Sequence, residues 1–137
     1  MRYTLFDNQK DGVLLVARVL LMLLFVIFGW SKITGFQGTV AYMAHVGAPL
    51  PPLAAGIAVV MELFVGIAIV LGFYTRPLAA LLALYTLGTA LIGHPFWDMS
   101  GMERLMNMIN FYKNISIIGG LLVLCVAGPG KYSLDRR

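Results

Sequence analysis

The chain has 137 residues, of which 60% are hydrophobic and 12% are charged. Its mean hydropathy of +0.87, with the apolar residues in long blocks, excludes an ordinary soluble domain, in which about a quarter of the residues are charged. The formal net charge is +4, but the basic residues are scattered, so nucleic acid is not expected as a partner. The composition predicts an all-α integral membrane protein in contact with the lipid bilayer, with residues 1–137 forming a single membrane domain.

The first apolar segment, residues 13–30, predicts the first transmembrane helix. This segment is longer than the apolar region of a usual signal peptide, and it carries Arg18. No small-residue cleavage site follows it, because the sequence continues as GWSKITGF. We therefore expect this helix to stay in the mature protein.

Two further spans follow the breaker GAPLPP at residues 47–52. Residues 53–73 form an apolar run of 21 residues, which is long enough to cross a bilayer. Residues 78–94 form the third span, which begins just after Pro77, a residue suited to the first turn of a helix. The segment 31–52, between the first two spans, is expected to be a loop.

The fourth span is predicted at residues 105–127. Its purely apolar part, residues 115–127, contains 13 residues and is too short to cross about 30 Å of hydrocarbon. Extension back to Leu105 gives 23 residues that end at the stop signal GPG, residues 128–130. This longer span places Lys113 and Asn114 inside the membrane. Together the spans predict a four-transmembrane-helix bundle.

The distribution of basic residues predicts the orientation of the bundle. An even number of spans leaves both termini on one side, and that side would hold six basic residues: Arg2, Lys10, Arg76, Lys131, Arg136 and Arg137. The opposite side would hold two, Lys32 and Arg104. The positive-inside rule then places both termini in the cytoplasm and the segments 31–52 and 95–104 outside.

Charged residues inside the spans form the first candidate site. Glu62 lies near the middle of the second span, where a carboxylate is costly unless it has a partner. At about 1.5 Å per residue, Glu62 and Lys113 lie at nearly the same depth on parallel helices, whereas Arg18 lies deeper. We therefore predict Lys113 as the partner of Glu62, ahead of Arg18, which either joins the cluster or extends toward the cytoplasmic side, with Asn114 in the same cluster. If all three charged groups are ionised, the cluster favours an anion or a carbonyl-bearing ligand.

A second candidate group lies near the outer boundary of the membrane and consists of Lys32, His45, His94, Trp97 and Asp98. Arg18, Phe25 and Lys32 are spaced by seven, so they share one stripe of the first helix and connect the two groups. The histidines and Asp98 have no metal-ligand spacing, so no metal site is predicted.

Two interpretations of these polar residues stay open. In the first, they only hold the helices in register, because a buried ion pair is weak evidence of stability but can specify an arrangement. In the second, they face a cavity and bind a polar head group or relay protons, which is the usual meaning of ionisable residues inside a membrane.

Seven segments along the chain carry a family resemblance: ARVLLMLLFVIFGWSKITGF, YMAHVGAPLPPLAA, VVMELFVGIAIVLGFYTRPLA, HPFWDM, NFYKN, GGLLVL and GPGKYSLDRR. Read in this order, they resemble the DoxX family of small bacterial inner-membrane proteins over nearly the whole chain. The resemblance implies a bacterial inner (plasma) membrane location. It also implies a link to quinone and redox metabolism, because the family is named after subunits of an archaeal thiosulfate:quinone oxidoreductase. The recurring residues of the family correspond here to Arg18, Lys32, Glu62, Arg76, His94, Lys113 and Asn114, and the resemblance implies no catalytic role for them.

The resemblance and the polar residues lead to three hypotheses about function. The first is an auxiliary membrane subunit of a redox enzyme, not catalytic by itself, with quinone as the candidate ligand of the polar cluster. The single cysteine, Cys125, excludes an internal redox-active pair, so the electron-carrying centre would lie on another subunit or in the quinone. The second hypothesis is a small transporter or channel-like protein that uses the buried Glu/Lys/Arg cluster. The third is a structural membrane scaffold, and a homo-oligomer is compatible with each of the three.

Overall fold

The computed structural model describes residues 3–136, which form helices and loops without a strand. Four membrane-length helical segments follow one another within these residues: α1 (Lys10–Thr34), the composite α3–η2–α4 (Pro51–Leu71), α5 (Thr75–Gly93) and α6 (Gly101–Ala127). Short turns, η1 (Asp7–Gln9) and η3 (Phe96–Asp98), precede α1 and follow α5. Each of the four segments is long and apolar enough to cross a membrane. The predicted fold class is therefore confirmed.

The helix ends lie a few residues from their predicted positions. α6 begins at Gly101, so the longer version of the fourth span is correct, and Lys113 and Asn114 lie within a helix. α5 begins at Thr75, before Pro77. The helix tolerates this proline because N–H groups in a first turn have no intrahelical partner.

The segment 31–52 was predicted to be a loop, and that prediction was wrong because it contains helix α2 (Phe36–His45). Gly35 separates α2 from α1, and the Thr39 hydroxyl donates to the backbone oxygens of Lys32 and Gly35, each at 3.2 Å. These bonds fix the bend between the two helices. A ten-residue helix gives no membrane-length apolar run, which is why span lengths did not reveal it.

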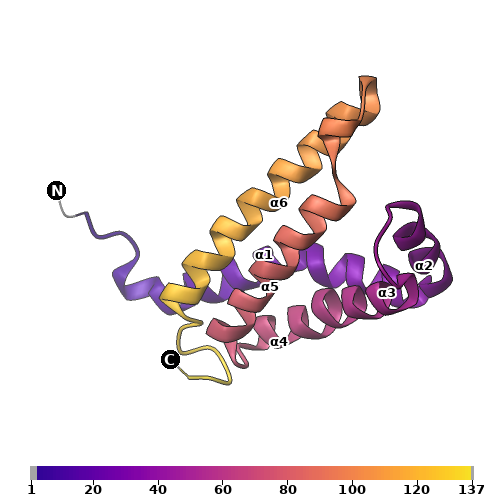
Figure 1. The fold of residues 1–137 in the computed structure, drawn as a ribbon. Coiled ribbons are helices and arrows are strands. Elements are labelled where there is room, and N and C mark those ends of the chain that lie inside the picture. The colour runs from indigo at the N-terminus through magenta and orange to yellow at the C-terminus, as the bar shows by residue number, and fades with distance from the viewer. Residues whose placement is uncertain (1–2, 137) are drawn as a thin grey trace.

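The helices form two arms (Figure 1). In the first arm, α1 packs along α3 (Pro51–Val59), the π-helical turn η2 (Val60–Val65) and α4 (Gly66–Leu71). In the second arm, α5 and α6 pair as an antiparallel hairpin. The arms meet near the two chain termini, which we call the termini end, and diverge toward α2 and η3, which we call the loop end (Figure 1).

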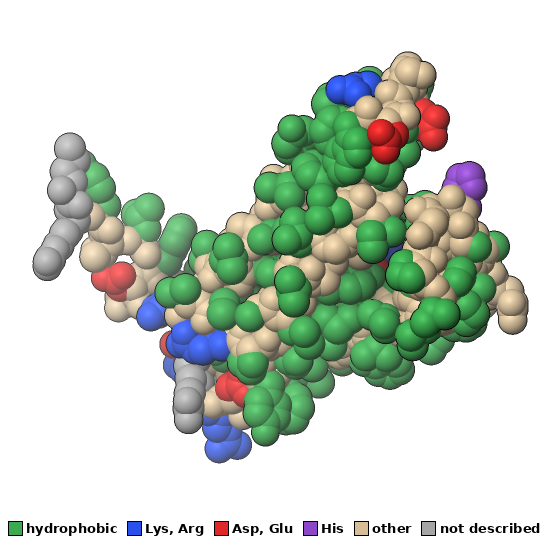
Figure 2. All heavy atoms as spheres, viewed as in Figure 1, with side chains coloured by type: hydrophobic (Ala, Val, Ile, Leu, Met, Phe, Trp, Pro, Cys, Tyr) green, Lys and Arg blue, Asp and Glu red, His purple; other side chains and the backbone are tan. Residues whose placement is uncertain are grey.

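The core lies between the arms. Met22, Ile69, Leu82 and Leu121 come one from each of the four spans, and all are fully buried. Many other leucine, valine, isoleucine and phenylalanine side chains point outward. Figure 2 shows them covering the visible face of both arms. An apolar surface of this extent is expected for helices surrounded by lipid.

Candidate functional site

A cavity of about 970 Å³ opens between the two arms toward the loop end. Residues of α1, α2, α3, η2, α5 and α6 line it, and most of the lining surface is apolar. Its ionisable and amide side chains are Lys32, Tyr42, Glu62, Tyr85, His94, Asn110, Lys113 and Asn114. Figure 2 shows the hollow between the arms, with part of a basic side chain inside it. An apolar cavity with a few converging polar groups is the usual form of a small-molecule site.

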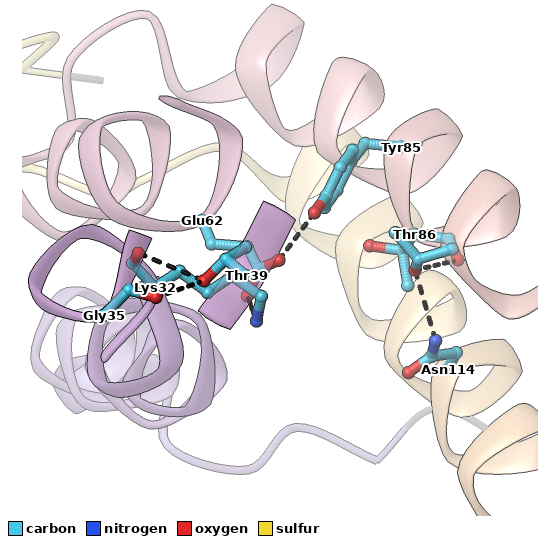
Figure 3. Close-up of polar contacts among 8 residues, drawn as sticks. Lys32, Gly35, Thr39, Glu62, Tyr85, Thr86 and Asn114 are labelled. Atoms are coloured by element: carbon cyan, nitrogen blue, oxygen red, sulfur yellow. Dashed lines mark hydrogen bonds and ion pairs between the residues drawn. The ribbon is translucent and has the colours of Figure 1, made fainter. Parts of the chain in front are cut away.

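The carboxylate of Glu62 has two partners in this cavity (Figure 3). Its Oε1 lies 2.8 Å from Nζ of Lys32, and its Oε2 accepts a hydrogen bond from the hydroxyl of Tyr85 at 2.5 Å. The predicted pairing of Glu62 with Lys113 was therefore wrong. The reason is that α6 pairs with α5 in the other arm, whereas Lys32 extends from α1, which packs directly against η2.

Backbone geometry places Lys32 beside Glu62. A Cβ at Gly29 of α1 would lie 2.5 Å from the backbone nitrogen of Leu63, so only glycine permits this approach of α1 to η2. Lys32 follows Gly29 by three residues and therefore projects from the same side of α1. Glu62 itself belongs to the π-helical turn η2. Such turns are rare and often occur at functional sites.

The second arm contributes amides and a lysine to the cavity. Lys113 Nζ donates to Oδ1 of Asn110 at 3.3 Å, and Nδ2 of Asn114 donates to the hydroxyl of Thr89 at 3.3 Å. Figure 3 shows Asn114 reaching toward α5. The structure thus brings Glu62, Lys113 and Asn114 to one cavity, although Glu62 and Lys113 do not pair.

Two ring side chains lie near the mouth of the cavity. His94 Nδ1 lies 2.9 Å from Oδ1 of Asn107, whose own Nδ2 donates to the backbone oxygen of Glu103. Tyr42 reaches from α2 toward the end of α5, where its hydroxyl oxygen would lie 3.6 Å from a Cβ at Gly93. Burial raises the pKa of the Tyr42 phenol, so this hydroxyl keeps its proton and can donate a hydrogen bond.

Arg18 does not belong to the cavity, so of the two positions that the sequence left open for it, the one in the Glu62 cluster was wrong. Its side chain is fully buried at the termini end. Its Nη1 donates to the backbone oxygens of Ile69 at 3.2 Å and Val70 at 2.9 Å, and its Nη2 donates to the oxygen of Tyr132. A guanidinium at the carboxyl end of α4 complements the negative end of the helix dipole. Arg18 therefore ties the C-terminal segment to α4.

The C-terminal segment completes this junction at the termini end. The Asp135 carboxylate accepts hydrogen bonds from the backbone N–H groups of Tyr74 and Thr75, so it caps the start of α5. Arg76 donates to the last carbonyl oxygens of α6, including that of Cys125 at 3.0 Å. The termini end is thus closed by side chains that bind helix ends, while the loop end contains the cavity.

The outer-boundary group predicted from the sequence divides in the structure. Lys32 and His94 line the cavity, whereas Trp97 packs edge-to-face with Phe96 and Phe111 beyond it. Asp98 and His45 are exposed and do not line the cavity. Within residues 3–136, no three His, Cys, Asp or Glu side chains form a group that could hold a metal ion.

The sequence reasoning missed three cavity residues, Tyr42, Asn110 and Tyr85, and the one that contacts Glu62 is Tyr85. Tyr85 is a neutral residue in an apolar span. A tyrosine well inside a transmembrane helix was a usable signal, because a buried hydroxyl normally finds a hydrogen-bond partner.

Comparisons with a family model and with known proteins point to the same family. The DoxX family model matches residues 13–95, which include Lys32, Glu62, Tyr85 and His94. The chain is 58% identical over 137 residues to the inner membrane protein YphA of Escherichia coli K12, covering 100% of this chain and 98% of that protein. It is 41% identical over 127 residues to the inner membrane protein YqjF of the same organism, covering 93% and 92%. A Bacillus subtilis protein whose name calls it an oxidoreductase, CatD, is 28% identical over 101 residues, covering 72% of this chain and 74% of that protein. No solved structure matches the chain.

Proposed function

The chain belongs to the DoxX family, and we propose that it is an auxiliary subunit of the bacterial inner membrane that holds a quinone for a redox enzyme. The observation that carries this proposal is the cavity between the arms, where polar groups converge inside a membrane-spanning region. The name of the relative CatD adds a weak link to redox chemistry. In this proposal the partner enzyme carries the electron-transfer centre, and the present chain binds and orients the quinone.

The orientation of the bundle is part of the proposal. Two relatives are named as inner membrane proteins, and the termini end holds most of the basic residues. Both termini are then cytoplasmic, and the cavity opens in the outer half of the membrane. A fusion of alkaline phosphatase to residue 137 tests this directly, because this enzyme is active only outside the cytoplasm. Phosphatase activity of the fusion would contradict the orientation.

The residues of the cavity fit the chemistry of a quinone head group. A quinone presents two carbonyl oxygens, which need hydrogen-bond donors, on a flat ring that packs against apolar side chains. The cavity supplies donors at Lys113 and Tyr42, and it supplies apolar walls that include Phe25 and Phe28. Its volume of about 970 Å³ lies within the range of small-molecule sites.

The chain itself holds the ligand in place. Glu62 pairs with Lys32 within the first arm and accepts a hydrogen bond from Tyr85 of the second arm. These contacts fix the distance between the arms around the ligand. The surrounding apolar side chains exclude water from the head group. A bound quinone supplies the capacity to accept electrons and protons.

Native extraction of the protein with its surrounding lipid tests the function. Mass spectrometry of the extract is expected to find a quinone and the subunits of an oxidoreductase, both depleted in Glu62→Gln. A folded protein that carries neither contradicts the proposal. Flux through liposomes that depends on Glu62 would instead support a small transporter. Full biological activity of a Glu62→Gln, Lys113→Met double variant would support a structural scaffold.

A further inference from the structure

Lys113 lies near the middle of its transmembrane helix. It follows Gly101 by 12 residues and precedes Ala127 by 14, which corresponds to about 18 Å and about 21 Å along the axis of α6. Its side chain lines the cavity. A lysine at this depth is costly unless a partner compensates its charge or water reaches it.

The neighbouring side chains do not compensate the charge of Lys113. Its ammonium donates to the neutral amide of Asn110, and within residues 3–136 no carboxylate lies at ion-pair distance from it. The carboxylate of Glu62 is engaged by Lys32 and Tyr85. Two lysines and one carboxylate therefore leave the cavity with a surplus positive charge, and this surplus lies at Lys113.

Lys113 also has unused hydrogen-bonding capacity and, unlike Lys32, a charge that no carboxylate within residues 3–136 pairs with. An ammonium has three N–H donors, and one of them is directed to Asn110. The single hydroxyl proton of Tyr85 is committed to Glu62, and the ammonium of Lys32 is held by the same carboxylate. A ligand oxygen that enters the cavity thus meets its strongest available donor at Lys113.

We propose that Lys113 is the residue that anchors a carbonyl oxygen of the quinone, with Asn110 orienting the ammonium. This inference rests on the function proposed above and names the contact that selects the ligand. An ammonium polarises a carbonyl group more strongly than a neutral donor does, and charge-assisted hydrogen bonds are shorter and stronger than neutral ones. Lys32, Glu62 and Tyr85 then act as positioning residues on the opposite wall.

Binding of decylubiquinone to the purified full-length protein in lipid nanodiscs tests the inference. Lys113→Met is expected to weaken binding at least about tenfold, the loss typical of a hydrogen bond from a charged donor. Lys113→Arg keeps the charge and the donors and is expected to restore most of the affinity. Lys131→Met removes a lysine at the termini end, outside the cavity, and is expected to bind like the wild type.

Infrared spectroscopy of the bound quinone supplies a readout that a purely structural role would not change. In the wild type, the carbonyl stretching band is expected at a lower frequency than in the free quinone, and Lys113→Met is expected to move it back. A folded Lys113→Met protein with unchanged affinity and an unchanged carbonyl band overturns the role of Lys113 but leaves the proposed function intact. A wild-type protein that does not bind decylubiquinone overturns both.

Discussion

The pairing of Lys32 with Glu62 predicts a specific pattern of stabilities in a double-mutant cycle. At an N–O distance of 2.8 Å and an effective dielectric constant of about 20, the Coulomb attraction is about 6 kcal/mol. The exposed fraction is 26% for the Lys32 side chain and 11% for the Glu62 side chain. Each group loses hydration on pairing, so the net coupling free energy is smaller than the Coulomb attraction. We expect a coupling free energy of about 2–4 kcal/mol between Lys32→Met and Glu62→Gln.

The assay is reversible unfolding in mixed micelles, followed by circular dichroism, for the wild type, both single variants and the double variant. Each single variant is expected to lose stability because it leaves a buried partner uncompensated, whereas the double variant recovers much of the loss. The matched comparison is the cycle of Glu62→Gln with Lys113→Met, for which we expect coupling below about 0.5 kcal/mol. Stronger coupling of Glu62 to Lys113 than to Lys32 would refute the arrangement of the two arms.

Three further substitutions test other contacts. Gly29→Ala is expected to destabilise the protein by about 1–3 kcal/mol in the same unfolding assay, because the added Cβ would meet the backbone of η2. The control is Gly56→Ala, whose Cβ has open space, and it is expected to be neutral or stabilising. Arg18→Met is expected to speed hydrogen exchange in residues 128–136 without changing quinone affinity, and a loss of affinity at full stability would contradict its position outside the cavity. Asp135→Asn keeps only one of the two acceptor oxygens and removes the charge at the start of α5, so we expect a loss of about 0.5–2 kcal/mol, and an unchanged melting temperature would argue against this cap.

The number and type of the spans were predictable from the sequence. A membrane requires about 20 apolar residues per helix, and this requirement alone extended the fourth span to include Lys113 and Asn114. Helix α2 was not predictable in the same way, because a helix of ten residues leaves no comparable signal.

The partner of Glu62 could not be predicted from the positions of the spans alone. A residue count gives the depth of a side chain along a helix, but it does not give the neighbouring helices or the direction in which the side chain points. Lys32 was placed outside the membrane because the first span was ended at residue 30, whereas α1 continues to Thr34. The close approach of α1 to η2 at Gly29 then brings Lys32 to the carboxylate.

Arg18 illustrates a second limit of sequence reasoning. An arginine inside a span suggested a partner among the other membrane charges, yet its acceptors are backbone oxygens at the end of α4 and in the C-terminal segment. That segment lacks regular secondary structure, so no periodicity indicates that it folds back against α4. Backbone carbonyl groups at a helix end are present in every sequence and carry no residue-specific signal.

Occupation of the cavity is the central claim, and a substitution at Gly88 tests it most directly. Gly88 of α5 lines the cavity, and a Cβ there meets nothing within 4 Å, so Gly88→Leu places added side-chain volume at the cavity wall from an uncrowded backbone position. Gly119 of α6 also has open space but does not line the cavity, which makes Gly119→Leu the matched control. We predict that calorimetric titration with decylubiquinone shows binding to the wild type and to Gly119→Leu, and none to a stably folded Gly88→Leu protein. Equal binding by all three proteins would show that the quinone does not occupy this cavity.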